Sequence, residues 1–171
     1  FATVGGDGWL RICRTESSLE MASLRVADGP VTRVEFLDDS RVATLSDVSG
    51  LQVWVIAAET LTAVVPRAPR VPNAFRLAVH PDKTEFACLG AGSAGMIVRY
   101  GGDVRSSRPF SLIGQDGDVR QILYASEGAH LATVGDDGSV RLWESATGKP
   151  VRDLSRHVGE VWLATDAAGR V

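Results

Sequence analysis

The chain of 171 residues contains few of the residues that usually support catalysis, metal binding or membrane insertion. It has two cysteines, two methionines and 6% aromatic residues, and its formal charge is only −3. Cys13 and Cys88 are too far apart in sequence to indicate a disulfide framework or a metal site. We expect both to be small buried side chains in a protein of a reducing compartment, the cytoplasm.

Long apolar runs and strong charge are also missing. No stretch approaches the roughly 20 apolar residues of a membrane span. A net charge of −3 is too small to indicate a nucleic-acid or membrane partner through bulk electrostatics.

The sequence has none of the common catalytic or cofactor patterns. His80, His130 and His157 are scattered, and there is no H-E-x-x-H, C-x-x-C pair, phosphate loop or G-x-S-x-G. The glycines of residues 90–95 lack the following helix and the Lys-Ser/Thr that a phosphate cradle needs. We therefore predict no enzyme activity, no cofactor and no metal site.

The sequence does contain a repeated hairpin pattern. In residues 130–144, HLATVGDDGSVRLWE, two alternating β-prone runs flank Asp-Gly, which is the strongest short-range signal of a β-hairpin. The pattern recurs at 1–13 and 42–54 and, more loosely, at 86–100. The copies open at Phe1, Val42, Phe86 and Leu131, with periods of 41, 44 and 45 residues. Such periods predict a repeat architecture in which each unit packs against its neighbours.

These repeats resemble the WD-repeat β-propeller family, whose blades are four-stranded sheets with a Ser/Thr-rich strand, an Asp-containing turn and a Trp ending the next strand. The resemblance implies an all-β fold of about four antiparallel four-stranded blades, which are expected to form a partial ring. We expect units at residues 1–28, 29–72, 73–113 and 114–156, with a partial fifth at 157–171. The first unit lacks its opening strand. In the third, residues 105–108 are expected to be loop and residues 109–113 a short outer strand.

The completeness of the ring is left open by the sequence. The chain can be a segment of a longer propeller, one half of an eight-bladed ring of two chains, or a four-bladed ring closed by pairing of residues 160–165 beside residues 1–4. A partial ring leaves an unpaired flank that invites further pairing, so self-association through open propeller edges is an expectation.

The resemblance also implies a structural network within each blade. In the family a Trp, a Ser/Thr, a His and the turn Asp are linked by buried hydrogen bonds. Gln115 stands where the fourth unit would carry the His, and Cys13 replaces the Trp of the first unit, so no unit has the complete set. The matched positions are Thr3, Asp7, Thr44, Asp47, Trp54, Thr133, Asp137, Trp143 and His157.

Candidate partner-binding residues lie in two places. The connection at residues 66–73 carries three prolines with Arg67 and Arg70. Prolines reduce the ordering entropy that binding costs, and arginines pair well with carboxylates or phosphates, although a rigid solvated loop explains the same residues. Further candidates near the entries of the inner strands are Arg33, Arg76, Arg120 and Trp162, which a ring would gather at one rim.

The sequence therefore predicts a non-catalytic scaffold or sensor region for protein–protein interaction, within a longer multidomain signalling or assembly protein. Its partners are expected to be proteins rather than nucleic acid or membrane. Two alternatives stay open. One is a propeller enzyme or small-ligand binder that uses the central channel, and the other is a purely architectural part without a partner.

Overall fold

The computed structural model describes residues 1–17, 19–57, 60–65, 75–90, 94–101, 104–112 and 117–156. Several predicted features lie outside these residues: Arg67, Arg70, Gln115, His157, Trp162 and the partial fifth unit. Apart from one turn of 3-10 helix at Ser126–Gly128, every regular element of the described residues is a strand. None of those residues forms a helix with the length and apolar character needed to cross a membrane.

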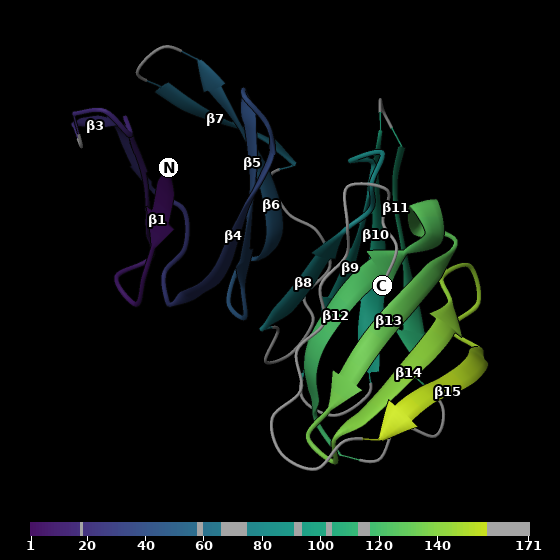
Figure 1. Ribbon diagram of the computed structural model, residues 1–171. Helices are drawn as coiled ribbons and strands as arrows, with labels where there is room; N and C mark the ends of the chain where they lie inside the picture. The colour runs from purple at the N-terminus through teal and green to yellow at the C-terminus, as the bar shows by residue number, and fades with distance from the viewer. Residues whose placement is uncertain are drawn as a thin grey trace. The chain divides into compact units, whose positions relative to one another are not determined.

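The strands form four antiparallel sheets, each built from strands that are consecutive in the chain (Figure 1). The first sheet has the order β1 (Ala2–Val4), β2 (Trp9–Cys13), β3 (Glu20–Arg25). The second has the order β4 (Val31–Asp38), β5 (Arg41–Ser46), β6 (Gly50–Ala57), β7 (Thr60–Val65).

The other two sheets repeat this arrangement. The third has the order β8 (Arg76–Val79), β9 (Glu85–Leu89), β10 (Ala94–Gly101), β11 (Val104–Ser111). The fourth has the order β12 (Val119–Ala125), β13 (His130–Gly135), β14 (Ser139–Glu144), β15 (Pro150–Arg156). The predicted all-β fold of antiparallel four-stranded blades is thus confirmed, with three strands in the first sheet.

One local prediction was wrong. Residues 105–108 were expected to be loop, but they belong to β11, which runs from Val104 to Ser111 and pairs with β10 along its whole length. Their run of Arg and Ser gives no apolar alternation, so the sequence did not look like a strand. Pro109 is tolerated inside β11 because this strand is the outermost of its sheet and need not donate from its free edge.

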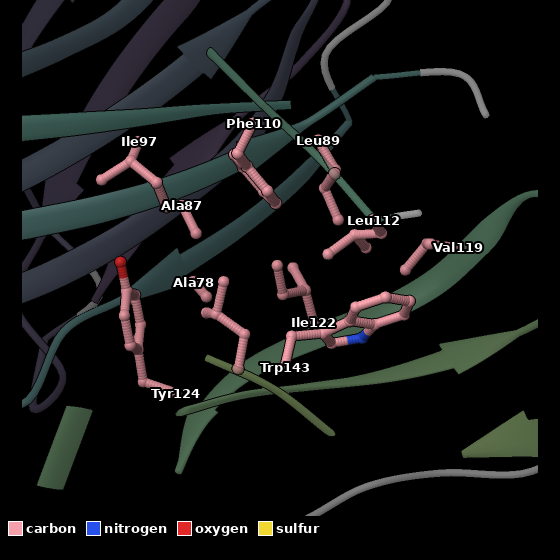
Figure 2. Packing of buried hydrophobic residues seen from close by; sticks show 11 residues of the cluster. Ala78, Ala87, Leu89, Ile97, Phe110, Leu112, Val119, Ile122, Tyr124 and Trp143 are labelled. Atoms are coloured by element: carbon pink, nitrogen blue, oxygen red, sulfur yellow. The ribbon is translucent and has the colours of Figure 1, made fainter. Parts of the chain in front are cut away.

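The described chain divides into two compact units, at residues 1–75 and 76–171. Each unit contains two sheets and its own hydrophobic cluster. In the first unit, residues of β2 such as Leu10 and Ile12 pack with Val42 and Trp54 of the second sheet. In the second unit, the cluster joins β9 and β10 to β12 and β14, and Figure 2 shows Tyr124 and Val119 on opposite sides of it, with Trp143 beside Ile122.

The second strand of each four-stranded sheet is almost completely buried. In β5, β9 and β13 nearly every residue is inaccessible, so neither face of these strands meets solvent. A strand covered on both faces needs small or apolar side chains throughout, or polar ones with partners. The segments VATLS, EFACL and LATVG have this composition, and their threonines and the glutamate are the residues that need partners.

Candidate functional site

Two sheets carry a buried hydrogen bond between a tryptophan and a threonine. The indole Nε1 of Trp54 in β6 donates to Oγ1 of Thr44 in β5 at 2.9 Å, and Nε1 of Trp143 in β14 donates to Oγ1 of Thr133 in β13 at 2.8 Å. All four side chains are buried. Each pair ties the second strand of a sheet to the third and satisfies a polar group that burial would otherwise penalise.

The other two sheets have different residues at these positions. In the first sheet, Cys13 lies opposite Phe1 and Thr3 is exposed. In the third, the register places Val98 opposite Phe86, and Cys88 takes the position of the threonine. The structure therefore brings the predicted Thr and Trp together in the second and fourth sheets and, among the described residues, in no other.

Cys88 is buried, as expected, but Cys13 is only half-buried. Cys13 is the last residue of β2, the central strand of a sheet that has one strand fewer than the others. Burial raises the pKa of the Cys88 thiol to about 12. This thiol is consequently un-ionised at neutral pH and unreactive.

Asp7 and Asp137 close equivalent hairpin turns in the first and fourth sheets. Oδ1 of Asp7 accepts from the backbone N–H of Trp9 at 3.1 Å, and Oδ1 of Asp137 accepts from the backbone N–H of Ser139 at 3.0 Å. Such Asx contacts replace a backbone hydrogen bond at a tight turn. Asp7 and Asp137 therefore cap the hairpin turns of the first and fourth sheets.

The same two aspartates face arginines at the same spacing. Asp7 accepts from Arg11 at 2.8 Å. The carboxylate of Asp137 lies 3.8 Å from Nη2 of Arg141, and Nε of Arg141 lies 3.2 Å from Asp153. Hydrogen bonding by the Arg11 guanidinium holds the pKa of Asp7 below its usual value. These arginines pair across the strands with Thr3 and Thr133, so turn and strand positions are linked in both sheets.

In the second sheet a serine, not an aspartate, caps the hairpin turn. Here Oγ of Ser46 accepts from the backbone N–H of Val48 at 3.2 Å and of Ser49 at 3.4 Å. Oδ1 of Asp47, the residue predicted for this role, is buried and meets no donor among the described residues. The loop from Thr44 to the positive-φ Gly50 is one residue longer than the corresponding loop of the fourth sheet, which shifts the aspartate away from the position that caps the turn.

A second polar network joins the two sheets of the second unit. Glu85, at the start of β9, is buried; its Oε1 accepts from the hydroxyl of Tyr124 at 2.9 Å, and its Oε2 lies 2.7 Å from Nε of the exposed Arg99. The ring of His80 meets Tyr124 edge-on at 4.9 Å, and its Nδ1 lies 2.8 Å from Asp82. Sequence reasoning missed these residues, because no motif relates a strand-opening glutamate to a tyrosine 39 residues later.

The predicted arginines lie at the beginnings of the inner strands. In the second unit, Nε of Arg76 in β8 donates to the backbone carbonyl of Arg120 in β12, so these two residues of neighbouring sheets are in contact. In the first unit, Arg33 of β4 is exposed and donates to the backbone carbonyl of Thr32 at 2.8 Å. The structure thus places Arg76 and Arg120 together, and it places Arg33 on an inner strand of the other unit.

The register shows that these three arginines are not equivalent. Arg33 pairs with Leu45 and Arg76 with Leu89, which are matching positions of the second strand. Arg120 instead is the extra residue of a bulge between Val119 and Gln121. A bulge redirects side chains locally, and this one turns an arginine to the surface beside the neighbouring inner strand.

Two arginines, Arg76 and Arg120, lie at this end of the second unit. Guanidinium groups bind carboxylates and phosphates through paired hydrogen bonds. Among the described residues, no three His, Cys, Asp or Glu side chains come together in a way that could hold a metal ion.

Three curated relatives align with most of the chain. The sequence is 27% identical over 170 residues to Periodic tryptophan protein 2 homolog of Dictyostelium discoideum, which covers 94% of the chain. It is 26% identical over 164 residues, 92% of the chain, to nucleoporin Nup43 of Mus musculus. It is 26% identical over 156 residues, 85% of the chain, to WD repeat and HMG-box DNA-binding protein 1 of Xenopus laevis.

The chain is homologous to WD-repeat proteins. It spans less than half the length of these relatives, namely 17%, 42% and 14% of them. No family model matches it. The departures described above, such as Cys13 and Val98 at tryptophan positions, show how far its repeats have diverged from one another. In general terms, homology to WD-repeat proteins indicates a scaffold for protein interaction.

Proposed function

We propose that the chain is a non-catalytic WD-repeat scaffold that binds a protein partner, as part of a longer multidomain protein of signalling or assembly. The observation that carries this proposal is the contact between Arg76 and Arg120 on neighbouring inner strands. The hydrogen bond to the Arg120 carbonyl holds the Arg76 side chain across the junction of two sheets. Holding a long side chain in place reduces the entropy that binding would cost.

The proposed partner presents acidic or phosphorylated side chains to these arginines. Arg120 is exposed, and Arg33 offers the same chemistry on the first unit. Arginine is enriched among the residues that dominate binding at protein interfaces, because its planar guanidinium forms several directed hydrogen bonds at once. Arg67, Arg70 and Trp162 remain candidate partner-binding residues, and they lie outside the described residues.

We further propose a reducing compartment, the cytoplasm, for this scaffold. Both described cysteines are free, and burial keeps Cys88 protonated inside the second unit. Free buried thiols persist where glutathione and thioredoxin keep thiols reduced.

The test is quantitative affinity capture with the chain and two matched variants. The first combines Arg33→Glu, Arg76→Glu and Arg120→Glu. The second carries the same charge change at Arg14, Arg25 and Arg152, which are exposed away from the inner strands. A partner should be retained by the chain and by the second variant and lost from the first. Titration of the captured partner should show at least about a tenfold weaker Kd for the first variant. Equal retention by both variants would overturn the arginine site.

A further inference from the structure

The outer edge of the third sheet, at β11, differs from the outer edges of the other sheets. β11 pairs with β10 over eight residues, from Ala94 opposite Ser111 to Gly101 opposite Val104, without a register shift. The pairings of the other outer strands, β3, β7 and β15, each contain at least one such shift. A bulge twists a strand and protects its edge, whereas a long regular edge is a template for another strand. β11 is therefore the outer strand best suited to accept one.

The backbone of β11 faces its partner strand and the free edge at alternate residues. Pro109 has no N–H, so in this uninterrupted ladder its backbone faces the free edge rather than β10. Because the bonding direction alternates along an antiparallel strand, Arg105 and Ser107 also face the edge, each with an N–H and a C=O. Among the described residues, no strand pairs with this edge. These main-chain groups are the ones that a further strand would bind.

The carboxyl end of β11 is packed against the fourth sheet. Phe110 is buried in the cluster that joins the two sheets (Figure 2). The turn at Gly148 approaches the same end, since a Cβ added to that glycine would lie 3.3 Å from the backbone oxygen of Ser111. A strand that binds at β11 would therefore bind along the part from Arg105 to Pro109.

The charge of the third sheet's outer strands restricts what can bind there. β10 and β11 contain Arg99, Arg105 and Arg108 and neither aspartate nor glutamate, and Asp103, which precedes β11, lies outside the described residues. Pairing of β11 with β11 of a second copy would combine two arginines from each strand, and like charges on paired strands are destabilising. A strand with acidic residues would instead form opposite-charge pairs. Charge complementarity thus disfavours a second copy and favours an acidic segment.

We propose that the outer edge of β11 binds an extended acidic segment of a protein partner by strand addition. The segment would form main-chain hydrogen bonds with Arg105 and Ser107 and with the C=O of Pro109. Acidic residues three positions apart would lie opposite Arg105 and Arg108, which have the same separation in β11. This surface is distinct from the arginine site proposed above, and neither proposal depends on the other.

The test is binding of a fluorescently labelled peptide, acetyl-Thr-Val-Glu-Thr-Val-Glu-Val-Thr-amide, to the 171-residue chain. Fluorescence anisotropy measures the Kd. The same peptide with lysine in place of both glutamates should bind at least about tenfold more weakly. Ser107→Pro removes an N–H from the edge, where Pro109 already shows that proline is tolerated, and should weaken binding of the glutamate peptide about tenfold or more.

Ser23→Pro is the matched control on another outer strand. Phe1 and Cys13 exchange backbone hydrogen bonds across β1 and β2, so by alternation Arg11 also bonds to β1, and Ser23, opposite Arg11, faces the outer edge of β3. This variant should bind the glutamate peptide like the unaltered chain. Circular dichroism establishes that both proline variants are folded.

Amide hydrogen exchange of the unaltered chain, followed by nuclear magnetic resonance, locates the peptide without any variant. With saturating glutamate peptide, the N–H groups of Arg105 and Ser107 should exchange about tenfold more slowly or less, and that of Ser106, which faces β10, should be unchanged. If Ser107→Pro does not fold, this measurement decides. Protection of Arg105 and Ser107 that rises with the concentration of the chain alone would identify a second copy as the occupant and would overturn the inference.

The remaining outcomes separate this edge from the proposed arginine site. Absent or equal binding of the two peptides, equal weakening by both prolines, or protection only outside β11 would overturn the inference. The variant that combines Arg33→Glu, Arg76→Glu and Arg120→Glu should bind the glutamate peptide like the unaltered chain. Loss of binding in that variant, with normal binding by Ser107→Pro, would place the peptide at the arginine site instead. Failure at β11 leaves the arginine site untouched, because affinity capture tests that site independently.

Discussion

The hydroxyl of Tyr124 in β12 donates a 2.9 Å hydrogen bond to the buried carboxylate of Glu85 in β9, across two sheets of the second unit. The other oxygen of the same carboxylate forms an ion pair with the exposed guanidinium of Arg99. The carboxylate therefore has an ionic partner on one side and a buried hydroxyl donor on the other. Figure 2 shows Tyr124 at the border of the apolar cluster. The pair thus fixes the fourth sheet to the third where apolar packing ends and polar contacts begin.

Tyr124→Phe should lower the free energy of unfolding by about 1–3 kcal/mol, because it removes a hydrogen bond to a charged and buried acceptor without changing the apolar volume. Urea denaturation of the chain measures the difference. Phe36→Tyr is the matched control, since Phe36 has the register position of Tyr124 in the first unit and is partly exposed. The control should change stability by less than about 0.5 kcal/mol. Equal effects of the two substitutions would show that the Glu85 contact contributes nothing.

The contrast between this pair and the Trp–Thr pairs shows what the sequence can predict. Trp143 and Thr133 stand ten residues apart within one hairpin, and the resemblance to the WD-repeat family implied their contact. Glu85 and Tyr124 belong to different repeats, and their contact depends on how two sheets pack. The resemblance to the WD-repeat family therefore implied the blades and the contacts within them, and it did not imply the contacts between them.

Loop length and bulges also limit what the sequence pattern can predict about individual side-chain contacts. Asp47 looked equivalent to Asp7 and Asp137, but one extra residue in its loop gives the capping position to Ser46. Arg33 and Arg120 likewise seemed matched by sequence, but β4 and β12 carry the same bulge, and Arg120 occupies the bulge position that Thr32 holds in β4, one residue before Arg33. Shifts of one residue change which side chain faces which partner, although they leave the hydrophobic pattern of the repeat unchanged.

Thr133→Val should lower the free energy of unfolding by about 1–3 kcal/mol, because the indole N–H of Trp143 would lose its acceptor while staying buried. Thr3→Val is the control at the same register position, where the threonine is exposed, and it should cost less than about 0.5 kcal/mol. A double-mutant cycle of Thr133→Val with Trp143→Phe, followed by urea denaturation, should give a coupling of about 1 kcal/mol. Additive effects would contradict the hydrogen bond.

Gly128→Ala should be among the most damaging small substitutions. Gly128 has a φ of 94°, and a Cβ there would lie 1.7 Å from Nε2 of His80. The backbone conformation alone costs about 1–2 kcal/mol for a residue with a side chain, and the clash adds to it. Thermal denaturation should therefore show a clear fall in Tm, which His80→Ala in the same chain should partly restore. Gly6→Ala, where a Cβ meets nothing within 4 Å, is the control and should be near neutral. A similar loss in both glycine variants would refute the role of His80.

One thiol should react in the native chain and two in the unfolded chain. Cys13 is half-buried, whereas Cys88 is buried and its pKa is raised to about 12, so almost none of it is the reactive thiolate at neutral pH. Ellman's reagent measures the number of reactive thiols in the native and in the unfolded chain. In Cys13→Ser the native chain should show no rapid reaction. Rapid reaction of that variant would mean that β9 opens to solvent in the native state.

Acid should weaken the first unit through Asp38. The backbone N–H of Ser40 donates to this carboxylate at 2.9 Å and Arg41 at 2.7 Å, and these contacts lower its pKa to about 2 from the usual 3.8. A folded-state pKa below the unfolded value means that the contribution to stability is complete above about pH 4 and is lost as the pH falls towards 2. The urea midpoint of the chain should therefore drop over this range, and that of Asp38→Asn should drop less. Asp39→Asn removes the same charge from the neighbouring position and is the control. An identical pH dependence of the chain and Asp38→Asn would show that Asp38 keeps its unfolded-state pKa in the native protein.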